Sequence, residues 1–212
     1  MFRQDNPLGI ILDWVFTQFL LNLLFLLFSI PIITVGVSAT ALYEMEYAVL
    51  EKRDGKLFSE FFRAFRNNFK KGMGVMLAIV VLIIIAGGIT GAAFLLGVDV
   101  KLVAFFAFLF AGGILVWIVA LIGRFEQKFS IIIQNAFLMS VRNLPLTLLL
   151  SLISFGLYAL IGLIPEVFFS GYAFVVQFFA PAVTTYLCTV LIMKCLRKQF
   201  PDLFPEKEAE EG

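Results

Sequence analysis

The chain has 212 residues, of which 61% are hydrophobic and 15% are charged, with a net charge of +1 and a mean hydropathy of +1.01. A soluble domain carries about 25% charged and about 45–50% apolar residues. The composition therefore excludes an ordinary soluble domain and predicts one integral membrane domain over residues 1–212. The chain has no histidine, which removes the commonest general base and the commonest metal ligand.

The first predicted transmembrane helix covers about residues 14–33, which is long enough to cross a bilayer. Gln18 and Asn22 are four residues apart, so they share one face of this helix. Polar side chains in hydrocarbon usually face protein or water, and we favour a hydrogen bond between helices over a substrate contact here. A substrate path would gather these two residues with Asp13 and Gln177 into an intramembrane polar site.

A turn of small and hydroxylated residues follows this helix. Proline ends or kinks a helix, glycine permits a turn, and serine or threonine can cap the next helix. That next helix, at about 38–53, carries three glutamates, so we expect it at the membrane surface. The turn is also a candidate partner motif, made of Pro31, Thr34, Gly36, Ser38, Thr40 and Tyr43.

A second surface helix is predicted over about residues 57–71, because its phenylalanines recur at helical spacing. The apolar stripe is Phe58, Phe61, Phe62, Phe65 and Phe69. The opposite side is basic and includes Arg63, Arg66 and Lys70. An aromatic face against a basic face favours a helix that lies in the bilayer surface. The alternative is a helix that packs its stripe on a protein core.

The rest of the chain repeats this alternation of surface helix and transmembrane helices. In order, we predict transmembrane helices at about 72–96 and 102–122, a surface helix at about 124–143, transmembrane helices at about 146–164 and 173–193, and a solvated acidic tail at 202–212. The predicted fold class is all-α. It is a polytopic membrane helical bundle of five transmembrane helices with two cytoplasmic interfacial amphipathic helices.

Lysine and arginine are distributed unevenly between the predicted loops. Fourteen of the 16 lie in the loop before residue 72, in the loop after residue 122 or in the C-terminal tail. Only Arg3 and Lys101 lie on the opposite side. The positive-inside rule places the fourteen in the cytoplasm, which puts the N-terminus outside and the C-terminus in the cytoplasm.

Two parts of the chain share one order of elements. Arg66-Asn67 precedes one predicted hairpin and Arg142-Asn143 precedes another, at an offset of 76 residues. Both units would have the same orientation in the membrane, which indicates a parallel internal repeat of helical hairpins. Independent hairpins of similar design remain the alternative.

Motifs of known chemistry are missing from the sequence. It contains no Walker A motif, no GxGxxG, no HExxH and no cysteine cluster with metal-binding spacing. Glu44 and Glu46 are two residues apart, so they do not share a helix face. We expect no catalytic residues, no cofactor, no metal and no nucleic-acid partner, and hence a protein that is not an enzyme.

Three stretches carry a resemblance to a known family. Residues 22–36 (NLLFLLFSIPIITVG), 39–43 (ATALY) and 61–70 (FFRAFRNNFK) resemble the YesL-like family of bacterial integral membrane proteins. Many relatives have a proline after the motif glycine, where this chain has Val37. The resemblance implies a bacterial plasma-membrane protein without established catalytic residues. Members are often encoded beside genes for carbohydrate uptake and breakdown, which implies an accessory role in sugar transport.

Two functional hypotheses follow. The first is a non-enzymatic accessory or scaffold that contacts the lipid bilayer and a membrane partner such as a sugar transporter component. The second is a small-solute transporter or permease, with a homodimer as one form. The third hypothesis is a lipid-interacting or membrane-enzyme role. Its lipid version rests on the basic helices, because each basic residue near an anionic surface contributes roughly 1 kcal/mol.

Overall fold

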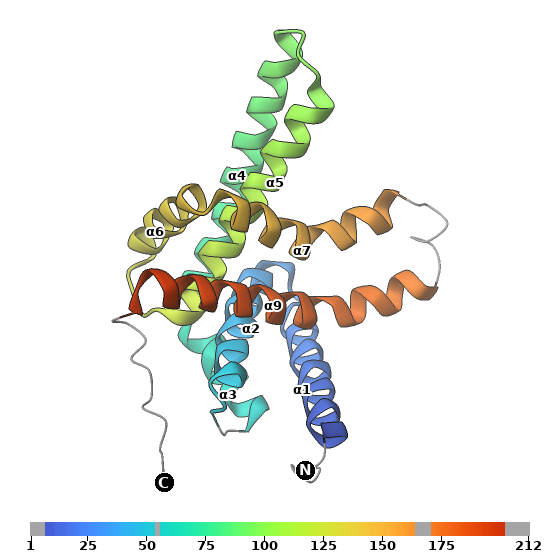
Figure 1. Cartoon of the computed structure of the whole chain (residues 1–212), viewed down its shortest axis with the longest axis vertical. Coiled ribbons are helices and arrows are strands. Elements are labelled where there is room, and N and C mark those ends of the chain that lie inside the picture. The colour runs from blue at the N-terminus through green and yellow to red at the C-terminus, as the bar shows by residue number, and fades with distance from the viewer. Residues whose placement is uncertain (1–6, 54–55, 164–170, 202–212) are drawn as a thin grey trace.

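Figure 1 shows the computed structural model of the chain, which describes residues 7–53, 56–163 and 171–201. All of its elements are helical. They are α1 (Pro7–Phe28), the 3-10 helix η1 (Ile32–Thr34), α2 (Val35–Leu50), α3 (Leu57–Asn67), α4 (Phe69–Leu95), α5 (Val100–Arg124), α6 (Phe129–Arg142), α7 (Leu144–Leu163) and α9 (Gly171–Gln199). The side chains of 157–163 and 171–179, and the acidic tail at 202–212, lie outside the described part of the chain. The all-α class predicted from the sequence is confirmed.

Three of the described helices are long and apolar enough to cross a membrane, at Leu8–Phe28, Phe69–Leu95 and Val100–Arg124. A fourth candidate is α6 with the first part of α7, if this pair, bent by 106°, is counted as one span. In Figure 1 the α4–α5 hairpin rises along the long axis, whereas α7 and α9 run across it. The structure therefore shows three or four candidate spans, and the five in the sequence remain a prediction.

The ends of these helices follow from local chemistry. Helix α1 ends at Phe28, and Pro31 adopts an extended conformation before η1 (φ −74°, ψ 112°), as expected from its fixed φ. Gly97 has a positive φ of 67° in the short α4–α5 connection, where a side chain would be strained. Asp99 caps α5 by accepting a hydrogen bond from the Lys101 backbone N–H at 3.0 Å.

Helix α2 lies at the centre of the fold. It packs against α1, α3, α4, α5 and α9, and most of its side chains are buried. This position corrects the expectation of a surface helix at 38–53. Small residues such as Gly36, Ala41 and Ala48 let neighbouring helices approach from several sides, and the glutamates find partners within the protein instead of in water.

The closest approach to α2 comes from α4. A Cβ atom added at Gly72 would lie 2.5 Å from the Val37 Cα, and one added at Gly36 would lie 2.5 Å from the Gly72 carbonyl oxygen. Both obstacles are backbone atoms, so a rotamer change cannot relieve the overlap. Only glycine at these two positions allows the α2–α4 crossing at this distance.

The largest buried cluster surrounds α5. Trp117 has no exposed surface, and its indole N–H donates to the Thr147 hydroxyl of α7 at 3.1 Å. The pairing satisfies the polar end of a large buried aromatic side chain, which is how tryptophan is usually accommodated. The contact joins the α4–α5 hairpin to α7.

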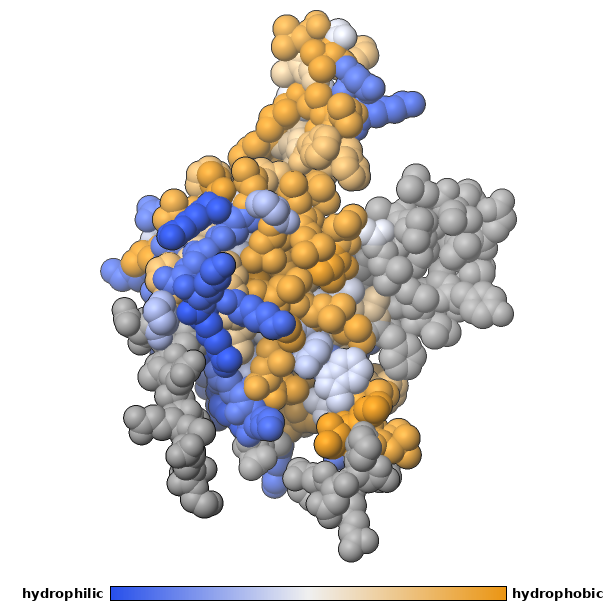
Figure 2. Space-filling view, viewed as in Figure 1, coloured by the Kyte–Doolittle hydropathy of each residue, from blue (hydrophilic) through white to orange (hydrophobic). Residues whose placement is uncertain are grey.

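The far half of the α4–α5 hairpin extends beyond the other helices (Figure 1). Its surface is hydrophobic in Figure 2, and Gly87, Gly88 and Gly91 face open space, with nothing within 4 Å of an added Cβ. Ile84 and Phe94 are 66% and 73% exposed. An apolar surface of this kind belongs in lipid or against another membrane protein.

Candidate functional site

The most unusual polar group in the described part of the chain is the carboxyl of Glu46. It lies on α2 with no exposed surface, and its Oε2 accepts a hydrogen bond from Gln18 Nε2 of α1 at 3.1 Å. Burial raises the pKa of Glu46 from 4.5 to about 8, and the Gln18 hydrogen bond opposes that rise. A buried carboxyl with one polar partner is a functional-site candidate.

Asn22 connects the same face of α1 to α9. Its Oδ1 accepts a hydrogen bond from the Ala182 backbone N–H at 3.3 Å, next to Pro181, the proline inside α9. Asn22 has no exposed surface, and Gln18 is 4% exposed. The hydrogen bonds between helices that their spacing favours are therefore present, one to α2 and one to α9.

The four residues of the predicted intramembrane polar site are not shown to converge. Asp13 is half-buried, five residues before Gln18 on α1. The Gln177 side chain lies outside the described residues. Of the three side chains that are described, Gln18 bonds to Glu46 of α2 and Asn22 bonds to the Ala182 N–H of α9. The sequence carries one signal for the burial of Glu46: the large apolar side chains of Met45 and Tyr47 flank it, as in a helix buried on several sides.

Two tyrosines lie beside Glu46 on α2. Burial raises the pKa of Tyr43 well above its usual value, with smaller contributions from Cys188, Tyr47 and Glu46. Cys188 of α9 is hydrogen-bonded to Tyr43 and lies 3.3 Å from the Ser154 hydroxyl of α7. Burial also raises the pKa of Tyr47, whose hydroxyl is buried without a hydrogen-bond partner, so both tyrosines are neutral across the physiological pH range.

The other glutamates of α2 bind elsewhere. Glu44 accepts a hydrogen bond from Asn68 Nδ2 at 2.6 Å, at the junction of α3 and α4. Glu51 pairs with Arg124 at the end of α5, and the Arg124 guanidinium lies 5.5 Å from the centre of the Tyr47 ring. The three carboxyls of α2 thus contact three different parts of the fold.

Replacing Asn68 by alanine should lower the free energy of unfolding by about 1–2 kcal/mol, because it leaves a half-buried carboxyl without its donor. The neighbouring Asn67 is exposed. Asn67→Ala is the matched control and should change stability by less than about 0.5 kcal/mol. Denaturant unfolding in mixed micelles measures both, and equal losses would show that the Glu44 contact contributes nothing.

The turn motif is a packing element of the interior. Gly36, Ser38, Thr40 and Tyr43 are buried. Thr34 is also buried, and its hydroxyl lies 2.7 Å from the carbonyl oxygens of both Phe28 and Pro31, which fixes the turn. Pro31 is exposed. Apart from Pro31, the candidate partner motif is therefore not an accessible partner surface in this structure, because α4 packs against Gly36 and α5 against Thr40 and Tyr43.

The predicted surface helix at 57–71 is broken at Asn68, so its phenylalanine stripe belongs to α3 up to Phe65 and to the start of α4 at Phe69. The stripe is divided between the protein interior and the surface. Phe61 is fully buried, and its ring centre lies 5.6 Å from that of Phe28 in α1; Phe65 lies 5.0 Å from the same ring. Phe58, Phe62 and Phe69 are exposed, as are the basic Arg63, Arg66 and Lys70. One side of the stripe packs on α1, which agrees with the alternative of packing on a protein core. The other side faces outward, and its contact with a bilayer surface stays a prediction.

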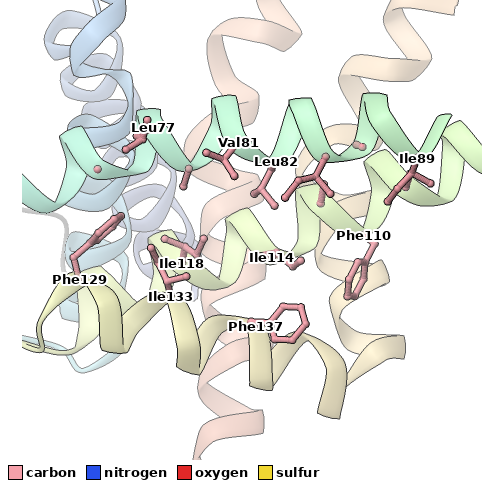
Figure 3. Close-up of a pocket in the computed structure, with 16 residues that line it drawn as sticks. Leu77, Val81, Leu82, Ile89, Phe110, Ile114, Ile118, Phe129, Ile133 and Phe137 are labelled. Atoms are coloured by element: carbon pink, nitrogen blue, oxygen red, sulfur yellow. The ribbon is translucent and has the colours of Figure 1, made fainter. Parts of the chain in front are cut away.

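Two apolar grooves flank the α4–α5 hairpin. The first, with a volume of about 470 Å³, lies between α4, α5 and α6, and Figure 3 shows Leu82, Ile114 and Phe137 lining it with carbon atoms. The second, of about 820 Å³, is bounded by α4, α5 and α7, with Ser151 and Lys101 as its polar lining residues. Grooves of this composition suit acyl chains or apolar side chains rather than sugars.

Metal-ligating side chains do not gather in the described residues, where no group of three or more His, Cys, Asp or Glu lies close enough to hold an ion. The fold and the exposed apolar helices define a multi-pass helical membrane protein. Residues 19–87, from within α1 to within α4, match the model of the family described as "Protein of unknown function, DUF624". Comparison with curated proteins and with solved structures gives no match.

Proposed function

We propose that the chain is a non-enzymatic accessory or scaffold protein of the bacterial plasma membrane that acts through its apolar hairpin. The observation that carries this proposal is the α4–α5 hairpin, whose far half is exposed and which is flanked by two apolar grooves. By contrast, the buried Gln18 and Asn22 are used between helices of the chain itself. A surface of this kind fits a membrane partner more readily than a soluble substrate.

The partner we propose is a component of a carbohydrate transport system. This step rests on the resemblance of residues 22–36 and 61–70 to the YesL-like family, whose members are often encoded beside carbohydrate genes. The DUF624 match covers both stretches and is compatible with it. The neighbouring carbohydrate genes suggest the class of partner, and the α4–α5 hairpin offers the surface that would contact it.

Photo-crosslinking in native membranes tests the proposal. A crosslinking residue at Ile84, which is 66% exposed on the hairpin, should capture a transporter component, whereas one at Leu23, which is 43% exposed on α1, should capture less of it. Recovery of no transporter component at Ile84, with the protein correctly inserted, would count against the scaffold function.

The alternative function is a small-solute transporter, and one observation favours it. Glu46 is a fully buried titratable group in the interior of a membrane protein, and such groups often lie on substrate or proton paths. Purified protein in liposomes should then take up a small solute, and Glu46→Ala should abolish uptake. Uptake equal to that of empty liposomes across a panel of sugars would remove this alternative.

We also infer five spans with the N-terminus outside and the C-terminus in the cytoplasm, on the basis of the lysine and arginine distribution. In Figure 1 the start of α1 and the α4–α5 connection lie at opposite ends of the long axis, whereas this orientation places both outside, so it rests on the charge distribution alone. Cysteine introduced at the exposed Ser59 should react with an impermeant maleimide only after the cytoplasmic side is opened. Labelling of this cysteine in intact cells would show that α3 lies outside and would contradict the inferred orientation.

The parallel repeat remains part of the proposal. Both units break between their surface helix and the next helix at an asparagine, Asn68 in one and Asn143 in the other. Asn68 donates to Glu44, and Asn143 accepts from Gln199 of α9 at 2.6 Å. The two breaks lie 75 residues apart, one less than the offset of 76 that relates Arg66-Asn67 to Arg142-Asn143, and the partners of the two asparagines differ, so independent hairpins remain the alternative.

A further inference from the structure

The Glu46 carboxyl is incompletely paired. One oxygen, Oε2, accepts from Gln18 Nε2, whereas the other, Oε1, is buried and has no hydrogen-bond partner. Burying an ionised carboxylate costs so much free energy that such a group normally takes up a proton instead. The environment of Oε1 is therefore unsuited to a charge.

The Gln18 amide has the complementary deficiency. Its Nε2 donates to Glu46, and its own Oε1 is buried without a partner. Each of the two paired groups thus has one unsatisfied oxygen. Two acceptors cannot bond to each other, but a single proton on Glu46 Oε1 supplies a donor for Gln18 Oε1. A planar acid and a planar amide can then join through two parallel hydrogen bonds.

We propose that Glu46 and Gln18 form a proton-binding site, in which Glu46 is a neutral acid that donates its Oε1–H to Gln18 Oε1. The proton comes from water and returns to water when the site opens. The pair joins α1 to the buried α2, and neighbouring Asn22 joins α1 to α9. This inference does not depend on the scaffold function or on any transport activity.

Within the described part of the chain, no neighbouring cation pairs with Glu46 in a way that would stabilise its ionised form. Besides Glu46, the titratable side chains described on α2 with its C-cap and on the helices packed against it are Asp13 (α1), Tyr43, Glu44, Tyr47 and Glu51 (α2 and its C-cap), Glu60, Arg63 and Arg66 (α3), Lys70 and Lys71 (α4), Lys101 and Arg124 (α5), and Tyr186, Cys188, Lys194, Cys195, Arg197 and Lys198 (α9). Arg124 pairs with Glu51, and Cys188 with Tyr43. Arg63 acts on Glu44. Among the described residues, none of these forms an ion pair with Glu46.

The proton site has a predictable effect on stability. The pKa of Glu46 is raised from 4.5 to about 8, so the folded protein holds this proton more tightly than the unfolded chain does. Folding stability is then fully present at low pH and falls as the pH rises above the unfolded pKa, by roughly tenfold in the equilibrium constant per pH unit. The decrease ends once the pH passes the folded pKa near 8.

Infrared spectroscopy of the purified full-length protein tests the proposal without relying on a variant. The wild type at about pH 6 should show the carbonyl stretch of a protonated carboxylic acid, and this band should disappear by about pH 10. The absence of the band at the lower pH, in protein that remains folded, would overturn the proposal.

Variants assign the band to its residue. Glu46→Gln keeps the shape and can still pair with Gln18, so it should fold, lose the band and remove the fall in melting temperature between about pH 6 and about pH 8. Glu44→Gln is the control, because Glu44 is only partly buried and pairs with Asn68. Glu44→Gln should keep both the infrared band and the fall in melting temperature with pH. A Glu46→Gln protein that retains both would contradict the assignment.

Discussion

Replacing Phe61 by alanine is expected to lower the free energy of unfolding by about 3–5 kcal/mol. The Phe61 side chain has no exposed surface, and it packs against Phe28 of α1 with ring centres 5.6 Å apart. Alanine leaves a cavity between α1, α2 and α3 that the surrounding helices can fill only in part. The loss should be visible as a lower denaturant midpoint in mixed micelles, with an unchanged slope.

The matched control is Phe58→Ala, three residues earlier on the same helix. Phe58 is 61% exposed, so its removal creates no cavity and should cost less than about 1 kcal/mol in micelles. If Phe58 contacts lipid, Phe58→Ala should weaken binding to a bilayer more than Phe61→Ala does. Equal destabilisation by the two substitutions would mean that α3 does not pack on α1 in the way described.

Replacing Gly72 by alanine is the second change with a large expected effect. The new Cβ would lie 2.5 Å from the Val37 Cα, so α2 and α4 must separate. Overpacking of this kind costs typically about 1–3 kcal/mol, and we expect the upper end because the obstacle is backbone. A pronounced fall in melting temperature, together with increased protease sensitivity of α2, is the expected result.

Gly88→Ala on the same helix separates this effect from helix propensity. Gly88 has nothing within 4 Å of an added Cβ, so alanine there should leave stability unchanged or raise it by up to about 1 kcal/mol, since alanine favours helix. If Gly72→Ala behaves in the same way as Gly88→Ala, the close α2–α4 crossing is not a feature of the folded protein.

The helices themselves could be predicted well from the sequence. Apolar length and periodicity located α4 and α5 to within three residues, whereas α1 begins and ends seven and five residues before the predicted bounds of 14–33. The position of α2 could not be predicted in this way. Its glutamates indicated a surface, because a single sequence shows that charges are present but not that Gln18, Asn68 and Arg124 are placed to receive them.

The candidate site was predicted in part. The spacing of Gln18 and Asn22 indicated a shared face that bonds to other helices, and the structure contains both bonds. Glu46 was missed as their partner because it is 28 residues away from Gln18, and periodicity carries no information about pairing between helices. The same limit applies to Thr34 and Thr40, whose hydroxyls bond within their own turns and whose burial depends on helices distant in sequence.

Cysteine accessibility tests the central claim, that α2 is the buried centre of this membrane protein. Ser38 on α2 has no exposed surface, whereas Ser59 on α3 is exposed, so Ser38→Cys and Ser59→Cys form a matched pair. With labelling of the folded protein read by peptide mass spectrometry, the cysteine at position 38 should react at least about tenfold more slowly than the one at position 59, and equally fast after denaturation. Equal rates in the folded protein would contradict the account.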